Sequence, residues 1–407
     1  MGNLLVGQSG GPTSVINSSL YGVISAAFES NSYDKILGMV NGIEGFLKES
    51  ILDFDTITDE EIKLLRTTPG AYLGSCRYKL PENLSDDIYP EIFKLLDKYN
   101  ISAFIYIGGN DSMDTVSKLS QYATQINSDI QFIGIPKTID NDLVLTDHTP
   151  GFGSAAKFVA SMVREISRDT SVYDRKTVTI IEIMGRNAGW LTAAAALARN
   201  EYNVAPDLIY LPEVVFNKDK FLADIHEVMK RKRCVVIAVS EGIRDENGHF
   251  LDDDSKYAKK DAFGHVLHSG TGKLLESLVF KEFGCKVRSI ELNVLQRCAM
   301  HIGSKTDLNE SFVIGSKAID KALENISGHV MGFKRLSNHP YEIDYISTDV
   351  REVANYEQKI PVEWINKEGN DITQELYDYL YPLIQGEVHV TYKDGIPSYY
   401  SCKHLEK

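Results

Sequence analysis

Apolar and polar residues alternate along the first 150 residues in the way typical of strands followed by amphipathic helices. Short runs rich in β-branched and aromatic side chains predict strands at Leu4–Val6, Lys35–Val40, Phe104–Ile107 and Phe132–Ile135. Helical spacing of apolar residues predicts helices near Val15–Phe28, Ile88–Tyr99 and Asp114–Tyr122. Strand–helix alternation of this kind predicts right-handed crossovers and a parallel sheet.

A second series of strands and helices begins near residue 150. Strands are predicted at Thr177–Ile183, Asp207–Tyr210, Val235–Val239 and Arg288–Leu292, and helices at Ser154–Ile166, Gly189–Arg199 and Glu310–Leu323. The polar, tyrosine-rich tail after about residue 340 carries no motif that suggests a role. The whole pattern predicts an α/β protein of two Rossmann-like lobes with mainly parallel sheets and an active site in the cleft between them.

Length and composition suit this architecture. A chain of 407 residues that is 43% hydrophobic can bury a large core and divides naturally into two lobes. We expect one lobe at residues 1–145, a second at 146–300, and a C-terminal segment at 301–407 that crosses back over both. No repeat or flexible linker interrupts the sequence.

Charge and cysteine usage exclude several classes of function. The net charge of −14 argues against nucleic acid or an anionic membrane as a partner. The five cysteines are scattered without CxxC spacing, which disfavours a disulfide framework or a zinc site and favours a reducing compartment. The chain opens directly on an apolar strand with no basic leader and no long apolar stretch. We therefore expect a cytoplasmic protein.

Two short polar segments, about thirty residues apart, carry the clearest chemical signal. Gly108–Ser112 and Pro136–Asp142 each follow an apolar strand directly. In open α/β sheets, ligands bind at the carboxyl ends of the strands. Glycine backbone, acids and one lysine at that edge suit phosphate or Mg²⁺ chemistry.

Each segment also has a plainer interpretation. Asp111 or Ser112 could simply cap the following helix, the commonest role for such residues there. Asp140 to Asp142 could form an Asx-type turn with all its side chains in water. The lysine at position 137, beside the glycine segment, favours the chemical interpretation, because a lysine can stabilise a phosphoryl group in transfer.

Further candidates occur at other strand ends. Gly10-Gly11 lies between the first strand and a helix, where bare backbone can approach an anion. Arginines are natural clamps for phosphate, because the planar guanidinium binds two oxygens at once. The arginines that follow turns or flank predicted strands are Arg77, Arg186, Arg288 and Arg297. At another strand end, Glu241 could accept hydrogen bonds from sugar hydroxyls.

Taken together, these segments resemble the phosphofructokinase superfamily over most of the first 300 residues. The ordered matches are the glycine-rich first turn, Gly74-Ser75-Cys76-Arg77, Gly108–Ser112, Pro136–Asp142, Met184-Gly185-Arg186, Glu241, and Arg288 with Gln296-Arg297. Members that use ATP carry glycine at the positions of Asp111 and Lys137, whereas members that use pyrophosphate carry aspartate and lysine, as here. The resemblance therefore points to the pyrophosphate-dependent branch, in which these larger side chains fill the space of the nucleotide.

The resemblance also implies a role for each matching residue. Asp140 would take the proton from the sugar hydroxyl, Lys137 would stabilise the transferred group, and Thr138 and Asp142 would support the reacting centre. The pyrophosphate-binding residues would be Gly10, Gly11, Arg77, Gly109, Asp111 and Ser112. The sugar-phosphate residues would be Met184, Gly185, Arg186, Glu241, Arg288 and Arg297. The first lobe would thus hold pyrophosphate and the second the sugar phosphate.

The implied activity is reversible, Mg²⁺-dependent transfer of a phosphoryl group from pyrophosphate to the 1-hydroxyl of fructose 6-phosphate, in glycolysis and gluconeogenesis, by a homodimer or homotetramer. An ATP-dependent phosphofructokinase and a non-catalytic regulatory subunit are the alternatives. Asn110 stands where the family usually has the aspartate associated with the metal, and we expect its amide oxygen to take that place. Val294 replaces a histidine or tyrosine near the sugar phosphate.

Overall fold

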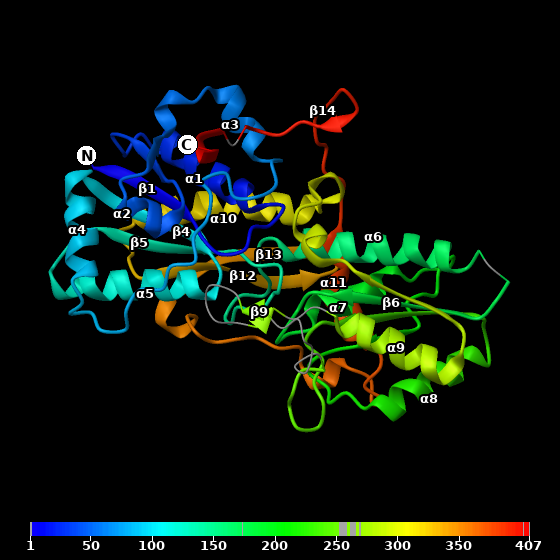
Figure 1. Cartoon of the computed structure of the whole chain (residues 1–407). Helices are drawn as coiled ribbons and strands as arrows, with labels where there is room; N and C mark the ends of the chain where they lie inside the picture. The colour runs from blue at the N-terminus through cyan, green and yellow to red at the C-terminus, as the bar shows by residue number, and fades with distance from the viewer. Residues whose placement is uncertain are drawn as a thin grey trace. The chain divides into compact units, whose positions relative to one another are not determined.

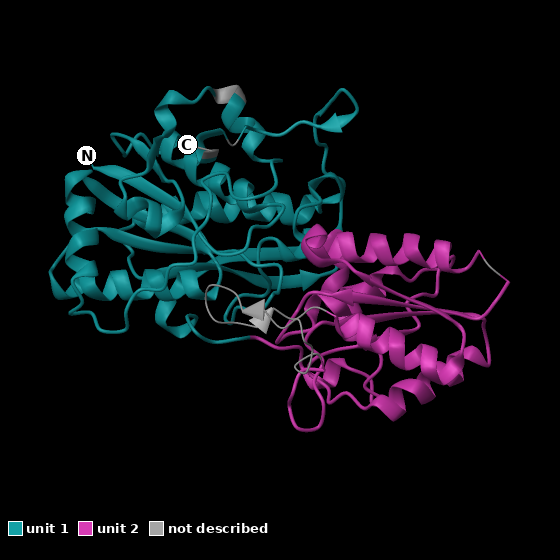
Figure 2. Ribbon diagram, viewed as in Figure 1, with its two compact units in different colours: residues 1–154, 297–357, 385–407 teal, residues 155–296, 358–384 magenta. Residues whose placement is uncertain are grey.

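The computed structural model describes residues 2–172, 174–251, 259–260, 266–267, 270–401 and 403–406. The chain forms two compact units (Figure 2). Unit 1 contains residues 1–154, 297–357 and 385–407, and unit 2 contains residues 155–296 and 358–384. The chain after residue 296 is therefore shared: residues 297–357 belong to unit 1, residues 358–384 to unit 2, and residues 385–407 to unit 1 again.

Unit 1 is built on a seven-stranded sheet with the order β13-β12-β5-β4-β1-β2-β3 (Figure 1). The strands β1, β2, β4, β5 and β12 run parallel, and β3 and β13 are antiparallel to their neighbours. Their bounds are β1 Asn3–Gln8, β2 Ile36–Met39, β3 Ile51–Asp53, β4 Ile101–Gly108, β5 Gln131–Pro136, β12 His329–Asn338 and β13 Tyr341–Asp349. A small antiparallel hairpin pairs β14 (Tyr392–Lys393) with β15 (Ile396–Pro397).

Both faces of this sheet are covered, which explains why its central strands are continuously apolar. Leu4 and Val6 of β1 belong to one apolar cluster, with α1 (Ile16–Ser30) and α10 (Lys305–Leu323). Leu5, between them, belongs to the other cluster, with α4 (Ile88–Lys98) and α5 (Asn110–Gln125). The shorter helices are α2 (Gly42–Leu47) and α3 (Asp59–Leu65).

The helices α1 and α10 cross with their backbones in close contact, and Figure 1 shows α10 (yellow) alongside α1 (blue). A Cβ atom added at Gly22 would lie 2.0 Å from the carbonyl oxygen of Phe312, and one at Gly315 would lie 2.2 Å from that of Ser19. Only glycine permits this approach from either side. The crossing fastens the chain after residue 300 onto the first helix of unit 1.

Unit 2 is built on a four-stranded parallel sheet with the order β11-β6-β8-β7. Its strands are β6 Thr177–Ile183, β7 Leu208–Tyr210, β8 Cys234–Ser240 and β11 Lys286–Glu291, and a separate pair joins β9 (Lys259–Lys260) to β10 (Val266–Leu267). Its helices are α6 Phe152–Thr170, which begins at the end of unit 1, α7 Trp190–Ala193, α8 Lys218–Met229, α9 Thr271–Phe283 and α11 Gln374–Leu380.

The predicted α/β class with mainly parallel sheets is confirmed, as are the strands and helices named from the sequence. The segment Gly189–Arg199 is buried as expected, although most of it is 3₁₀ helix. The sequence pattern missed β12 and β13, which complete the first sheet. Of the described helices, none combines the length and apolarity needed to cross a membrane. The four described cysteines are free thiols, and Cys402 lies outside the described residues.

Candidate active site

The loop between β5 and α6, residues 137–151, is braced across its base. The hydroxyl of Thr149 donates to the carbonyl of Thr138 (2.8 Å), and the Thr138 N–H donates to the carbonyl of Pro150 (3.2 Å). Asn141 adopts a left-handed conformation (φ 56°), and its side-chain oxygen accepts from the Thr149 N–H (3.0 Å). We call residues 137–151 the catalytic loop. Its bracing fixes the polar residues at its start.

Lys137 is buried, with only 3% of its surface exposed. Its ammonium group donates to the carbonyl of Gly11 (2.5 Å), and its backbone N–H donates to the carbonyl of Gly108 (2.9 Å). One residue thus joins the two glycine turns at the ends of β1 and β4. Asn141, four residues on, is only 1% exposed, so the side chains of residues 140–142 are not all in water as a solvated Asx turn would require.

Four charged side chains act on the Lys137 ammonium. Burial lowers the pKa of Lys137 to about 8, and the positive charges of Arg297 and Arg77 act in the same direction. The carboxylates of Asp140 and Asp142 oppose that change. The cluster therefore holds three cationic groups against two acids in a partly buried place, an arrangement that favours a bound anion.

The two aspartates of the loop have different surroundings. Asp140 contacts Thr138 twice: its backbone N–H donates to the threonine hydroxyl (3.1 Å), and that hydroxyl lies 3.4 Å from its carboxylate. Burial raises the pKa of Asp142 to about 7, and the negative charges of Asp140 and Glu357 add to the increase. The carboxylate of Asp140 is thus oriented by Thr138, whereas burial disfavours the charged form of Asp142.

The glycine turn after β1 has two cationic neighbours. A Cβ atom added at Gly11 would lie 2.9 Å from Nη1 of Arg297, and one at Gly10 would lie 3.4 Å from the ammonium of Lys137. Gly10 has a left-handed conformation (φ 76°), and its carbonyl accepts from the hydroxyl of Ser75 (2.6 Å). Bare backbone is therefore required here, and it lies within reach of the arginine and the lysine.

The second glycine turn opens α5. Among the described residues, no side chain caps α5 at Gly109, so the first turn of the helix can receive an anion. Ser112 is buried beside Gly108, and Asp111 is exposed in the first turn. The side chain of Asn110 bonds to the backbone of a distant segment: its N–H donates to the carbonyl of Tyr356 (2.8 Å), and its oxygen accepts from the Asn355 N–H.

A separate polar group lies in unit 2, where Met184 and Gly185 follow β6 and Glu241 follows β8. The carboxylate of Glu241 accepts from the Gly185 N–H (3.3 Å), and Gly185 has a positive φ of 134°. A Cβ at Gly242 would lie 1.9 Å from the carbonyl of Arg186. The Nε of Arg186 is buried without a hydrogen-bond partner among the described residues, which suits a ligand that would accept from it.

Two arginines do not lie where the sequence suggested. Arg288 does not flank its strand but lies within β11, and it forms an ion pair with Asp169 of α6. Arg297 belongs to unit 1 and lies beside Gly11, with the residues expected to bind pyrophosphate. The other residues expected for the sugar phosphate, Met184, Gly185, Arg186 and Glu241, follow β6 and β8 in unit 2.

A buried ionic network supports the far end of the catalytic loop. The two ring nitrogens of His148 lie 2.8 Å from the carboxylates of Asp147 and Glu310. Arg335 of β12 pairs with Asp147 (2.8 Å), and Tyr341 donates to Glu310 (2.7 Å). Burial alone would lower the pKa of His148, but the two carboxylates outweigh it and raise the pKa to about 9. Sequence reasoning missed this network, since nothing near His148 marks it.

No three His, Cys, Asp or Glu side chains of the described residues converge as a protein-only metal site requires. Mg²⁺ commonly takes one or two carboxylates and completes its shell with phosphate oxygens and water. The Asp140–Asp142 pair fits that mode, because a cation between carboxylates and phosphate would relieve the repulsion that raises the pKa of Asp142.

Comparisons with known proteins identify the family of the chain. A family model described as phosphofructokinase matches residues 3–319. A pyrophosphate–fructose 6-phosphate 1-phosphotransferase from Xanthomonas campestris pv. campestris is 41% identical and covers 99% of this chain and 97% of its own length. A sulfofructose kinase from Alkalicoccus urumqiensis is 32% identical over 86% of this chain and 88% of its own.

A solved structure extends the similarity to three dimensions. The pyrophosphate-dependent phosphofructokinase from Marinobacter aquaeolei matches with a TM-score of 0.88 and 36% identity. The match covers 98% of this chain and 96% of the other. The similarity therefore includes β12, β13 and the shared C-terminal segment as well as the motifs.

The His148 network predicts a pH-dependent contribution to stability. The pKa of His148 is 6.5 for a free imidazole and about 9 in the folded protein, so the fold favours the protonated ring. This stabilisation is complete below about pH 6.5 and is lost as the pH rises through 9. We expect His148→Gln to lower the free energy of unfolding by roughly 3 kcal/mol at pH 6, and by much less at pH 10. Urea unfolding of both proteins at several pH values measures this, and a difference independent of pH would contradict it.

Proposed function

The chain belongs to the phosphofructokinase family, and from that premise we propose that it transfers a phosphoryl group from inorganic pyrophosphate to the 1-hydroxyl of fructose 6-phosphate. The products are fructose 1,6-bisphosphate and phosphate. The observation that carries the proposal is Lys137, a buried ammonium group that joins two glycine turns and has Arg77 and Arg297 acting on it. Such a cluster suits a small, highly charged donor.

The reaction proceeds by positioning and charge stabilisation. The 1-hydroxyl oxygen attacks the terminal phosphorus of pyrophosphate, the bridging P–O bond breaks, and phosphate leaves. Asp140, oriented by Thr138, accepts the hydroxyl proton. Lys137, Arg77 and Arg297 neutralise the charge that develops on the phosphates.

Donor and acceptor draw on different parts of the chain. The backbone of Gly10, Gly11 and Gly109, with Ser112 and the open first turn of α5, takes the pyrophosphate, and Asp111 and Lys137 leave no room for a nucleotide. In unit 2, Met184, Gly185, Arg186 and Glu241 take the sugar phosphate, for which the buried Nε of Arg186 is the strongest support. Arg297 serves the donor in this proposal because of its position beside Gly11.

We assign Mg²⁺ to the acidic pair Asp140 and Asp142 rather than to Asn110, whose amide is already engaged with the backbone of residues 355 and 356. The ion would supply charge neutralisation on the phosphate oxygens. The free thiols favour a reducing compartment, and we infer the cytoplasm as the site of action.

A panel of donors and acceptors tests the function. Initial rates with fructose 6-phosphate and Mg²⁺ should be high with pyrophosphate and negligible with ATP, because Lys137 and Asp111 occupy the nucleotide's space. Turnover with ATP and none with pyrophosphate would make this an ATP-dependent enzyme. Sulfofructose belongs in the same panel as a second candidate acceptor, because a relative named for it matches over 86% of the chain.

Replacement of the proposed base should abolish most of the activity. We expect Asp140→Asn to lower kcat by about 10²- to 10⁴-fold, because the amide cannot accept the hydroxyl proton. Steady-state rates with pyrophosphate measure the loss, and circular dichroism checks the fold. Asp129→Asn, the same change at an exposed loop residue, is the matched control. A near-normal rate in Asp140→Asn would remove this residue from the mechanism.

The pH profile should report on Lys137. With a pKa of about 8, its ammonium group begins to lose its proton above neutral pH. We expect kcat/KM for pyrophosphate to fall as the pH rises through about 8, since this parameter follows the free enzyme. Lys137→Arg should keep its charge and move the fall to higher pH. An identical profile in that variant would show that another group controls it.

A further inference from the structure

A short segment after β13, residues 350–357, lies against the start of α5 and against the catalytic loop. We call this segment the strap. It begins with a single 3₁₀ turn at Val350–Glu352, where the Val350 N–H donates to the carbonyl of Gly328 (2.9 Å). Val350, Val353 and Ala354 are buried in the same apolar cluster as Met113 of α5 and Leu143 of the catalytic loop. These three side chains anchor the strap in the core, while its remaining five residues are exposed.

Asn110 fastens the strap to the first turn of α5. Its side-chain oxygen accepts from the Asn355 N–H, and its side-chain N–H donates to the carbonyl of Tyr356 (2.8 Å). The two bonds join positions about 245 residues apart. An amide can both donate and accept, so one side chain satisfies two consecutive backbone groups of the strap.

A third bond between α5 and the strap lies one helical turn further on. The Asn355 side chain donates to the carboxylate of Asp114 (3.2 Å), four residues after Asn110 on α5. Asn355 itself has a left-handed conformation (φ 68°), which turns the chain at this point. Asn110 and Asp114 of α5 therefore bind the strap at Asn355 and Tyr356, and we call these three hydrogen bonds the clamp.

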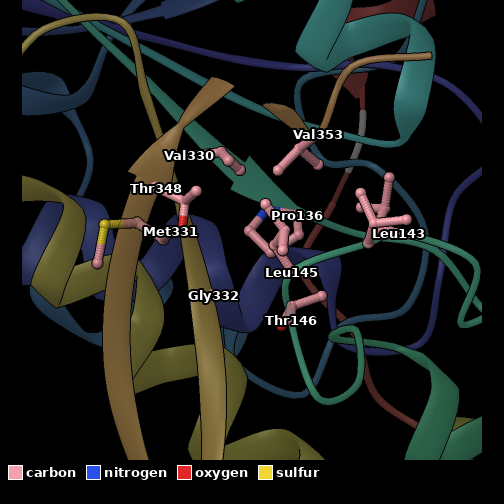
Figure 3. A pocket seen from close by; sticks show the side chains of 10 residues that line it. Pro136, Leu143, Leu145, Thr146, Val330, Met331, Gly332, Thr348 and Val353 are labelled. Atoms are coloured by element: carbon pink, nitrogen blue, oxygen red, sulfur yellow. The ribbon is translucent and has the colours of Figure 1, made fainter. Parts of the chain in front are cut away.

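The strap also reaches the catalytic loop. Figure 3 shows Val353 of the strap facing Pro136 and Leu143 across a small, mainly apolar hollow. At the end of the strap, the carboxylate of Glu357 lies near enough to Asp142 for its charge to be felt there. Movement of the strap would therefore change both the packing under the catalytic loop and the charge beside it.

The clamp explains why position 110 is asparagine in a place where an aspartate would be favoured locally. The first turn of a helix stabilises negative charge, so aspartate would suit α5 at this position. An aspartate could still accept from the Asn355 N–H, but it could not donate to Tyr356, and its second oxygen would face that carbonyl at 2.8 Å. Two acceptors at that distance repel each other. Only an amide satisfies both backbone groups.

We propose that Asn110 is a positioning residue, whose amide clamps the strap against α5 and so holds the phosphate-binding turn and the catalytic loop in their reactive arrangement. The proposal rests on the proposed function. It replaces the role of metal ligand that the sequence assigned to this residue. The chain passes from unit 1 into unit 2 directly after Glu357, the last residue of the strap. The clamp therefore lies close to one of the points at which the chain leaves unit 1.

The test compares Asn110→Asp, Asn110→Ala and Asn355→Ala with the wild-type enzyme. All three should lower kcat with pyrophosphate about five- to twentyfold, with little change in KM for fructose 6-phosphate, because the reacting groups lose alignment while the unit 2 residues are untouched. Hydrogen exchange of the peptide that contains Asn355 should become faster in each variant. Asn83→Asp, whose exposed oxygen accepts from the Ser85 N–H in a way aspartate can reproduce, is the matched control.

The outcomes separate the alternatives. If Asn110 were a metal ligand, Asn110→Asp would lower the Mg²⁺ concentration needed for half-maximal rate and tighten Mn²⁺ binding measured by calorimetry, with exchange of the strap unchanged; that result would overturn the proposal. Kinetics and exchange equal to those of Asn83→Asp would overturn it as well. If the wild-type enzyme does not use pyrophosphate, the proposed function fails, and the exchange measurement still tests the clamp.

Discussion

The buried ammonium group of Lys137 is the constraint on which the rest of the site depends. Taking a charge out of water is costly unless other groups compensate, and here the carbonyl of Gly11 and the acids of the catalytic loop do so. Arg77 and Arg297 add positive charge to the same place. Three cationic groups thus lie close together at the ends of β1, β4 and β5, an arrangement that suits an anion which several cations can share.

Much of unit 1 serves to hold that group in place. The backbone of Lys137 is joined to the end of β4, and its side chain to the turn after β1, so three parallel strands contribute to one point. The catalytic loop that follows is braced at its base by Thr149 and at its far end by the charged network around His148. Asp307 of α10 accepts from the Gly151 N–H (2.9 Å) and ties the start of α6 to the same framework. Rigid support of this kind is what positioning catalysis requires.

The residues that support the site come from segments with no visible signal in the sequence. Arg335 and Tyr341 belong to β12 and β13, and Asn355 and Glu357 belong to the strap that follows. β13 is an edge strand that is only half-buried, so its alternation of Glu342 and Asp344 with larger side chains looks polar along the sequence. Its partner β12 pairs with β5, which lies nearly 200 residues earlier in the chain. A local pattern does not contain that pairing.

The sequence by itself determined the α/β class, the order of the main elements and the gathering of glycines, acids and Lys137 at one edge of a sheet. These follow from local properties: apolar runs buried on both faces form parallel strands, and the carboxyl ends of such strands meet at the same edge. Only the tertiary structure decided that Arg297 lies beside Gly11, that Arg288 pairs with Asp169, and that the amide of Asn110 bonds to the backbone of residues 355 and 356. Each of these contacts depends on which segments, far apart in the sequence, pack together in the fold. The same side chain can bind a substrate, form an ion pair or hydrogen-bond to a peptide group, and only its neighbours in space decide which of these it does.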